Sequence, residues 1–236
     1  MFRRLLPFLF ASFGTASAQD LVMVAPLNQI MPLVQFQNDK LTGGILKDLG
    51  DALGQRLGRR VNYVSVPGPD VSGVLTQGKA DGICYVRPIW IDGDFDWTKP
   101  VIADSELVAA IPSATPIRSL LDLRDRPVGT VTSYRYPRVE QVLGLRFQRI
   151  DSPTMDENLR KVVSGQIRYT VISQVIMSYQ QRVNRDVRLR RDLVFATFNA
   201  QCAFSKRSNV PFAEVNSAIN AMLEDGTVED ILRRYR

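Results

Sequence analysis

The stretch "LTGGILKDLGDALGQRLGRRVNYVSV", residues 41–66, contains the pattern that decides the fold. Its first part has an aliphatic residue at every fourth position, which is the spacing of one face of an α-helix: Ile45, Leu49, Leu53 and Leu57. Its last part, "RVNYVSV", alternates β-forming residues and predicts a strand. A helix that leads directly into a strand is the repeating unit of α/β proteins.

The same order of elements continues on both sides of this stretch. "LVMVA" (21–25) predicts a strand before it, and a short helix at about 70–77, the strand "DGICYV" and the extended "SELVAAIP" follow it. The pattern restarts after the break "PSATP", with strands at "PVGTV", "RFQRI" and "YTVIS" and with helices between them. Strands that alternate with helices predict a parallel-type sheet covered on both faces. Two such runs predict two lobes with a ligand cleft between them.

The first 18 residues have the layout of a secretory signal peptide. Arg3 and Arg4 precede an apolar block, and the small residues Ala16-Ser17-Ala18 end the segment. We therefore expect cleavage near Ala18 and a periplasmic protein. An uncleaved N-terminal membrane anchor is the alternative.

Composition excludes several classes of function. The chain has no histidine, which rules out a Ser-His-Asp triad and a His-ligated metal, and two cysteines alone do not make a zinc site. No glycine-rich phosphate loop is present. The net charge of +6 comes from arginines that are scattered rather than interleaved with aromatics, which argues against nucleic-acid binding. We therefore expect a protein that is not an enzyme and that has no cofactor and no metal.

Five segments, in order, resemble bacterial extracellular solute-binding proteins of family 3, best known as amino-acid receptors of ABC importers: residues 31–66, "LTQGKADGICYVR", "FDWTKPV", "LLDLRDRPVGTV" and "VNSAINAMLEDGTVEDILRRY". The resemblance implies an α/β fold of the two-lobed, type II Venus-flytrap kind, with two chain crossings. Lobe 1 would comprise residues 19–108 and 200–236, and lobe 2 residues 113–196. The crossings would lie near 109–112 and 197–199.

The resemblance also implies where a ligand binds. Amino-acid-binding members have an aspartate at the end of a lobe 2 strand, which pairs with the ligand's ammonium group, and Ser173 stands at that position here. A buried zwitterion needs an opposite charge at each end, so we expect no standard amino acid and no side chain that holds a cation. The family's carboxylate-binding arginine is also missing from its usual place, and Arg87 stands several residues earlier.

The implied replacement chemistry favours anions. The turn of Ser133, Tyr134 and Arg135 precedes a helix that begins near Pro137, and a helix N-terminus beside an arginine attracts anions. With Arg87 facing this turn, and with Tyr85 and Trp90 as flat surfaces, the cleft suits an anionic or carboxylated solute, an aromatic one included. Other roles stay open: Arg135 pointing to solvent, Arg87 pairing with Asp92 or Asp94, and Tyr85, Trp90 and Ser173 serving only in packing.

Cys84 and Cys202 lie on strands that are neighbours in the resembled fold, which implies a disulfide in an oxidising periplasm. Two buried free thiols are the alternative.

These observations predict a monomeric periplasmic solute-binding protein that delivers a small molecule to an ABC permease or acts as a sensor with another membrane partner. One alternative is an exported accessory protein that docks on a partner without binding a solute. The other is a dehydratase-like enzyme on the same fold, for which Glu106, Asp92 and Asp94 are the candidate acids.

Overall fold

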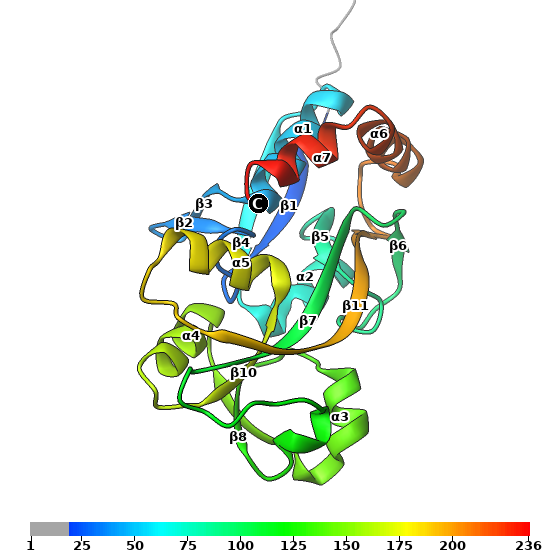
Figure 1. Ribbon diagram of the computed structural model, residues 1–236. Coiled ribbons are helices and arrows are strands. Elements are labelled where there is room, and N and C mark those ends of the chain that lie inside the picture. The colour runs from blue at the N-terminus through cyan, green and yellow to red at the C-terminus, as the bar shows by residue number, and fades with distance from the viewer. Residues whose placement is uncertain (1–18) are drawn as a thin grey trace, which may run out of the picture.

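The computed structural model describes residues 19–236, so the predicted signal peptide lies outside the described residues. The described chain forms two lobes joined by one nine-stranded sheet (Figure 1). The strand order is β4-β1-β5-β11-β7-β10-β8-β9, with β6 paired to β11. The sheet is mixed, and not parallel throughout as the alternating pattern predicts, because both long strands that join the lobes run antiparallel to their neighbours.

The first lobe is built around β1, which pairs in parallel with β4 and β5. The helix predicted from residues 41–66 is present, and Ile45, Leu49 and Leu53 are its buried face. The C-terminal helices α6 and α7 pack on this helix. The elements of this lobe are β1 (Leu21–Pro26), α1 (Ile45–Leu57), β4 (Val61–Val66), α2 (Val71–Thr76), β5 (Gly82–Val86), α6 (Phe212–Glu224) and α7 (Thr227–Arg233).

The second lobe repeats the arrangement on a smaller scale. Its central strand β8 pairs in parallel with β9 and β10, and α4 packs against all three strands. Val128, Val139 and Leu143 belong to a separate buried cluster in this lobe. Its elements are η2 (Leu120–Leu123), β8 (Pro127–Val131), α3 (Pro137–Leu143), η3 (Gly144–Arg146), β9 (Gln148–Ser152), α4 (Met155–Val163), β10 (Tyr169–Ser173) and α5 (Gln174–Val183).

Two long strands, β7 (Ile102–Ala110) and β11 (Arg190–Ser205), run from one lobe to the other and pair along most of their length (Figure 1). Residues 106–110 of β7 pair with β10 of the second lobe, whereas residues 201–205 of β11 pair with β5 and β6 of the first. Residues 103–105 lie opposite 197–199 between these two regions. We propose that both crossings lie here, so that the first is at 103–105 rather than at 109–112.

Several helices and strands are not predicted from the sequence, among them α5, the hairpin of β2 and β3, and β6. The helix α5 starts directly after Ser173, without a break in the apolar pattern. The hairpin of β2 (Gln35–Gln37) and β3 (Lys40–Gly43) and the strand β6 (Phe95–Trp97) are too short to produce a periodic signal.

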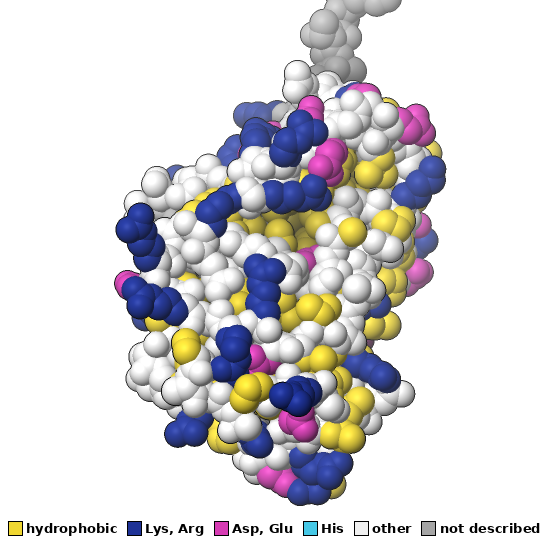
Figure 2. Space-filling view, in the orientation of Figure 1, with side chains coloured by type: hydrophobic (Ala, Val, Ile, Leu, Met, Phe, Trp, Pro, Cys, Tyr) yellow, Lys and Arg dark blue, Asp and Glu magenta, His cyan; other side chains and the backbone are white. Residues whose placement is uncertain are grey.

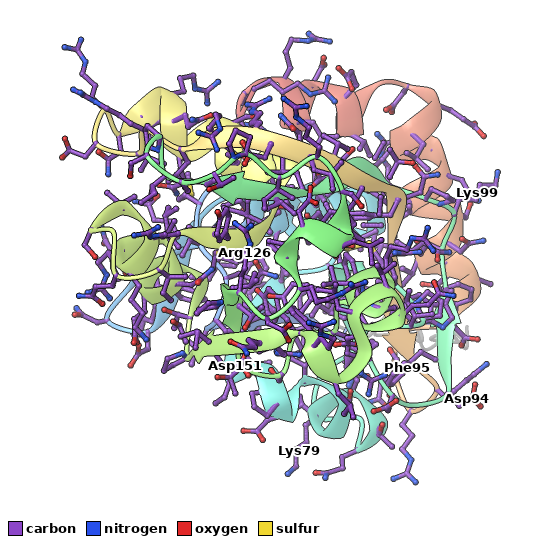
Figure 3. The ribbon with its side chains drawn as sticks, turned by 60° about the horizontal axis from the view of Figure 1, so that its bottom comes forward. Lys79, Asp94, Phe95, Lys99, Arg126 and Asp151 are labelled. Atoms are coloured by element: carbon purple, nitrogen blue, oxygen red, sulfur yellow. A yellow bond between two sulfur atoms is a disulfide. The ribbon has the colours of Figure 1, made fainter. Side chains whose placement is uncertain are left out.

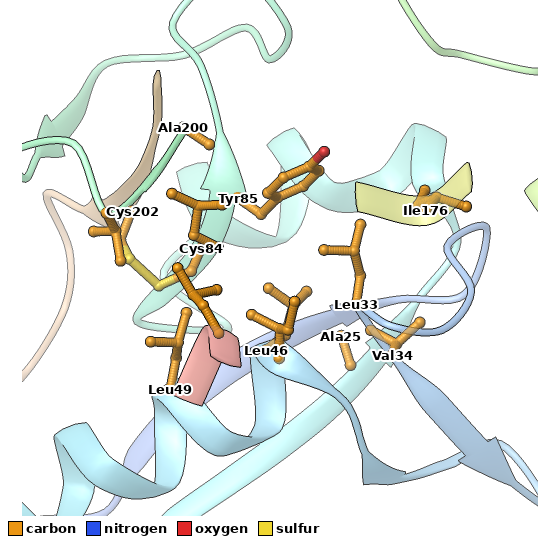
Figure 4. Packing of buried hydrophobic residues seen from close by; sticks show 14 of the residues in the cluster. Ala25, Leu33, Val34, Leu46, Leu49, Cys84, Tyr85, Ile176, Ala200 and Cys202 are labelled. Atoms are coloured by element: carbon orange, nitrogen blue, oxygen red, sulfur yellow. A yellow bond between two sulfur atoms is a disulfide. The ribbon is translucent and has the colours of Figure 1, made fainter. Parts of the chain in front are cut away.

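Cys84 of β5 and Cys202 of β11 lie opposite each other in the sheet and form a disulfide (Figure 4). Both side chains are buried in the main core, in the same cluster as Leu46 and Leu49 of α1. The bond joins residues 118 positions apart. It therefore ties the returning C-terminal part of the chain to the first half of the same lobe.

Charged side chains are spread over the surface. Figure 2 shows Lys and Arg on every part of the visible face, with Asp and Glu between them rather than in one basic stripe. Lys79, Asp94 and Lys99 project outward at the edge of the molecule (Figure 3). Within residues 19–236, no helix has the length and apolar character needed to cross a bilayer.

Candidate functional site

A cavity of about 130 Å³ lies between the lobes. Both lobes line it, through residues such as Asn28 and Trp90 of the first and Tyr134 and Met155 of the second. The residues that follow the carboxyl ends of β1, β5, β8 and β10 converge there, as expected for the ligand crevice of an α/β protein. Glu106 and Arg135 are the charged side chains among the described lining residues.

The structure brings most of the predicted site residues together. Six of them line the cavity: Tyr85, Trp90, Ser133, Tyr134, Arg135 and Ser173. Arg87 is not among the described lining residues. Its guanidinium carbon lies 5.5 Å from the ring centres of both Trp90 and Phe198, so it stacks on these aromatic rings as a cation–π partner.

Three aromatic rings form one wall of the cavity. The ring centres of Trp90 and Phe198 are 4.9 Å apart, and the Tyr85 ring lies 6.2 Å from each of them. These rings therefore pack on one another and line the cavity at the same time. The sequence analysis missed Phe198, because it lies in the crossing strand β11, where nothing local indicates that its side chain faces a cleft.

Arg135 connects the second lobe to the first across the mouth of the cavity. Its guanidinium donates to the Asp92 carboxylate and, at 3.4 Å, to the Ile89 carbonyl oxygen. The hydrogen-bonded ion pair holds the pKa of Asp92 below its ordinary value. Asp92 therefore pairs with Arg135 and not with Arg87. The Arg135 side chain has a protein partner and does not simply point to solvent. The turn before it includes Ser133 with a φ of 67°.

Ser173 ends β10 and begins α5. Its hydroxyl oxygen accepts from the Ile176 N–H at 3.4 Å, so the serine caps the helix. Close to it, the Tyr85 hydroxyl donates to the Asp104 carboxylate at 2.6 Å, and that carboxylate also accepts from the Val175 N–H. Burial raises the pKa of Asp104, against the lowering effect of these donors. An aspartate thus stands near the serine, but it comes from β7 and is engaged by the protein.

Glu106, one of the candidate acids of the enzyme alternative, lines the cavity. It pairs with Ser173 in the β7–β10 register, is 8% exposed and lines the cavity. Burial raises the pKa of its carboxyl to about 7, while Arg87 opposes the shift and Asp104 adds to it. A carboxyl therefore lines the cleft, whereas the sequence analysis expects no group there that could hold a cation. The signal in the sequence is the pair of acids at alternate positions in "DSELVAA", an otherwise largely apolar strand.

Comparison with known proteins gives matches at the level of structure. No protein-family model and no curated protein sequence matches the chain. Solved structures do match, among them the arginine-, lysine-, histidine-binding protein ArtJ from Geobacillus stearothermophilus, with a TM-score of 0.78 and 16% identity over 92% of this chain and 94% of that one.

Two further matches each have a TM-score of 0.76 and 19% identity, covering 92% of this chain and 95% of the other. They are the ancestral amino-acid-binding protein AncCDT-1, a precursor of cyclohexadienyl dehydratase, and a histidine kinase sensor domain with similarity to periplasmic binding proteins. The chain has the periplasmic-binding-protein fold. The resemblance to solute-binding protein family 3 is thus confirmed in the fold.

The two lobes of this periplasmic-binding-protein fold are in contact around the cavity. The Asn28 carbonyl oxygen of the first lobe accepts from the Met155 N–H at 3.0 Å and lies 3.5 Å from the Tyr134 hydroxyl. The Gln180 side-chain amide donates to the Met31 carbonyl oxygen at 2.8 Å. Together with the Arg135–Asp92 pair, these hydrogen bonds hold the two lobes against each other, so the lobes are closed around the cavity.

Two cavity-lining residues also have a polar side-chain atom that lacks a hydrogen-bond partner among the described residues. Gln29 Oε1 and Trp90 Nε1 are buried without a hydrogen-bond partner among the described residues. Both residues line the cavity. Buried polar groups in native proteins are nearly always paired, and exceptions often belong to functional sites. Within residues 19–236, these two atoms are therefore unsatisfied polar groups of residues in the cavity wall.

Proposed function

We propose that the protein is a periplasmic solute-binding protein that captures a small carboxylated solute with an apolar or aromatic body. The observation that carries this proposal is the cavity between two closed lobes, which both lobes line. Its walls are largely apolar, and aromatic rings face a single carboxyl and a single guanidinium. Such a pocket, with few well-placed polar groups, is the usual form of a small-molecule site.

The size of the cavity limits the solute. A volume of 130 Å³ corresponds to about ten water-sized spheres of 10–15 Å³ each. A molecule of about ten non-hydrogen atoms fits this space, which is the size of an amino acid or of a substituted aromatic acid. The flat faces of Trp90 and Phe198 favour an aromatic or planar body.

Arg135 is the proposed carboxylate partner. Arginine can bind a carboxylate through two parallel N–H donors, whereas in this structure one terminal nitrogen of Arg135 donates to Asp92 and the other to the Ile89 carbonyl oxygen. The two side chains are 42% and 78% exposed, so solvent weakens their pairing. A ligand carboxylate can displace Asp92 at low cost. Arg87 then supports the site indirectly, by holding the Trp90 and Phe198 rings in place.

A thermal-shift screen of residues 19–236 against amino acids, aromatic and aliphatic carboxylates and phosphates tests the proposal. A ligand at a hundredfold excess over its Kd stabilises the protein by about 2.7 kcal/mol, which is easily seen. We expect the carboxylate shift to be lost in Arg135→Ala and enlarged in Asp92→Asn, which removes the competing anion. Arg138→Ala, an exposed arginine on α3, is the matched control.

Absence of a shift with every compound would contradict solute capture and would favour the accessory protein that docks on a partner. A shift that Arg135→Ala leaves intact would place the carboxylate elsewhere in the cavity.

We further propose that the closed form is recognised by a membrane partner, either an ABC permease or a sensor. The similar structures include binding proteins and a sensor domain, which supports both. The match to a precursor of a dehydratase keeps the enzyme as an alternative, with Glu106 as its acid.

A further inference from the structure

We infer that Glu106 determines the specificity of the cavity by binding a protonated amino group of the solute. This inference rests on the proposed function and deepens it. It assigns to the solute a cationic group that contacts Glu106, in addition to the carboxylate that contacts Arg135.

The strand β7 directs Glu106 into the cavity. Side chains alternate between the two faces of a strand, so Asp104, Glu106 and Val108 lie on one face. Val108 is buried in the core of the second lobe, and Asp104 lies where the chain crosses between the lobes. Glu106 lies between them, at the end of the cavity next to Ser173.

The neighbouring acids differ from Glu106 in having protein partners. Asp104 accepts hydrogen bonds from Tyr85, Ser105 and Val175. Asp92 is paired with Arg135. The Glu106 carboxyl accepts no hydrogen bond from any residue in the described range 19–236, although it is 8% exposed. Its hydrogen-bonding capacity is therefore available to a bound molecule.

An unpaired buried carboxylate is costly, and a cation removes that cost most effectively. The charged and titratable groups that act on Glu106 are Arg87, Asp104 and Glu140, with Tyr136 close by. Of these Arg87 is cationic, and its guanidinium lies over the Trp90 and Phe198 rings, outside the set of cavity-lining residues. A ligand ammonium group at Glu106 places a positive charge in direct contact with the carboxylate, which Arg87 does not do.

The Glu106 carboxylate has two oxygens, and each can accept a hydrogen bond from a ligand ammonium group. An ammonium group has three N–H donors, so it needs more than one acceptor when water is removed. The two Glu106 oxygens supply such acceptors, whereas a ligand carboxylate at this position would be repelled by ionised Glu106.

Two pairs of probes of matched shape test the inference: 4-(aminomethyl)benzoate against 4-methylbenzoate, and 5-aminopentanoate against pentanoate. Each pair differs by its amino group and shares its carboxylate. Binding is measured by calorimetry at pH 8 to the wild type, to Glu106→Gln and to Glu224→Gln. Glu224 is exposed at the end of α6 and serves as the control for the same chemical change.

We expect at least one amine-bearing probe to bind the wild type and Glu224→Gln at least tenfold more tightly than its partner, and Glu106→Gln to lose this preference. Equal binding of both partners, or a preference that survives in Glu106→Gln, would overturn the role of Glu106. Binding of carboxylates without either amine would overturn it too, while leaving the proposed function intact. If no carboxylate or amine binds, the proposed function itself fails, and the role of Glu106 with it.

Discussion

Glu106 and Ser173 lie opposite each other in the β7–β10 pair, but their side chains make different contacts. The serine hydroxyl is used to cap α5, whereas the glutamate carboxyl has no protein partner in the described range. An acid is therefore present near the position where family members have their aspartate, but it is supplied by the crossing strand. A serine in place of the family's aspartate therefore does not leave the cleft without a carboxyl, because Glu106 of the opposite strand lines it.

The buried carboxyl predicts a pH-dependent stability. At pH 4 it is protonated in both the folded and the unfolded chain, so it has little effect on the free energy of unfolding. Between pH 4.5 and about 7 it ionises only in the unfolded chain, and the free energy of unfolding falls. Glu106→Gln removes this fall, so at pH 8 we expect the variant to be about 3 kcal/mol more stable than the wild type.

Urea unfolding at pH 4 and pH 8 measures this difference. The two proteins should be nearly equally stable at pH 4. An equal gap at both pH values would mean that the carboxyl is not the cause. A gain in stability on removal of Glu106 is the behaviour expected of a residue that is retained for function rather than for folding.

At the scale of elements, the ends of α1 depend on two glycines with different surroundings. Gly44 precedes the helix with a φ of 102°, and an added Cβ atom would lie 2.5 Å from the Leu33 carbonyl oxygen. Gly58 ends the helix with a φ of 63° and has open space around it. At Gly44 both the positive φ and the contact with Leu33 disfavour a side chain, whereas at Gly58 only the positive φ does.

We therefore expect Gly44→Ala and Gly58→Ala to differ in their effect. Gly44→Ala should lower the free energy of unfolding by about 3 kcal/mol or more, because the contact is with backbone that cannot easily move. Gly58→Ala should cost about 1 kcal/mol, the usual cost of a left-handed residue with a side chain. Denaturant unfolding measures both, and equal losses would contradict the assignment of a steric clash to Gly44.

At the scale of the whole molecule, the Cys84–Cys202 disulfide fixes the returning chain to the first lobe. It closes a loop between residues 118 positions apart, so chain entropy predicts a stabilisation of about 5 kcal/mol. We expect the Cys84→Ala, Cys202→Ala double variant to lose an amount of this order, measured by urea unfolding. Reduced wild-type protein should behave like the variant, and an unchanged stability in both would contradict this role.

The sequence predicts the elements and the fold class well, because the evidence for them is local. The spacing of Ile45, Leu49 and Leu53 identifies α1 from one short stretch, and the alternation of strands and helices identifies two lobes. Six of the seven predicted site residues line the cavity, because loops after strand ends meet at the cleft of such folds. Arg87 is the exception, and its place depends on the rings of Trp90 and Phe198.

Two α/β lobes can be predicted from the amino-acid pattern, since periodic burial along a helix or strand is encoded within a few turns of chain. Only the tertiary structure decided that Glu106 faces the cavity, that Arg135 meets Asp92 and that the two cysteines join. Each of these contacts links segments far apart in the sequence. Their positions follow from the pairing of β7 and β11, which no local pattern specifies.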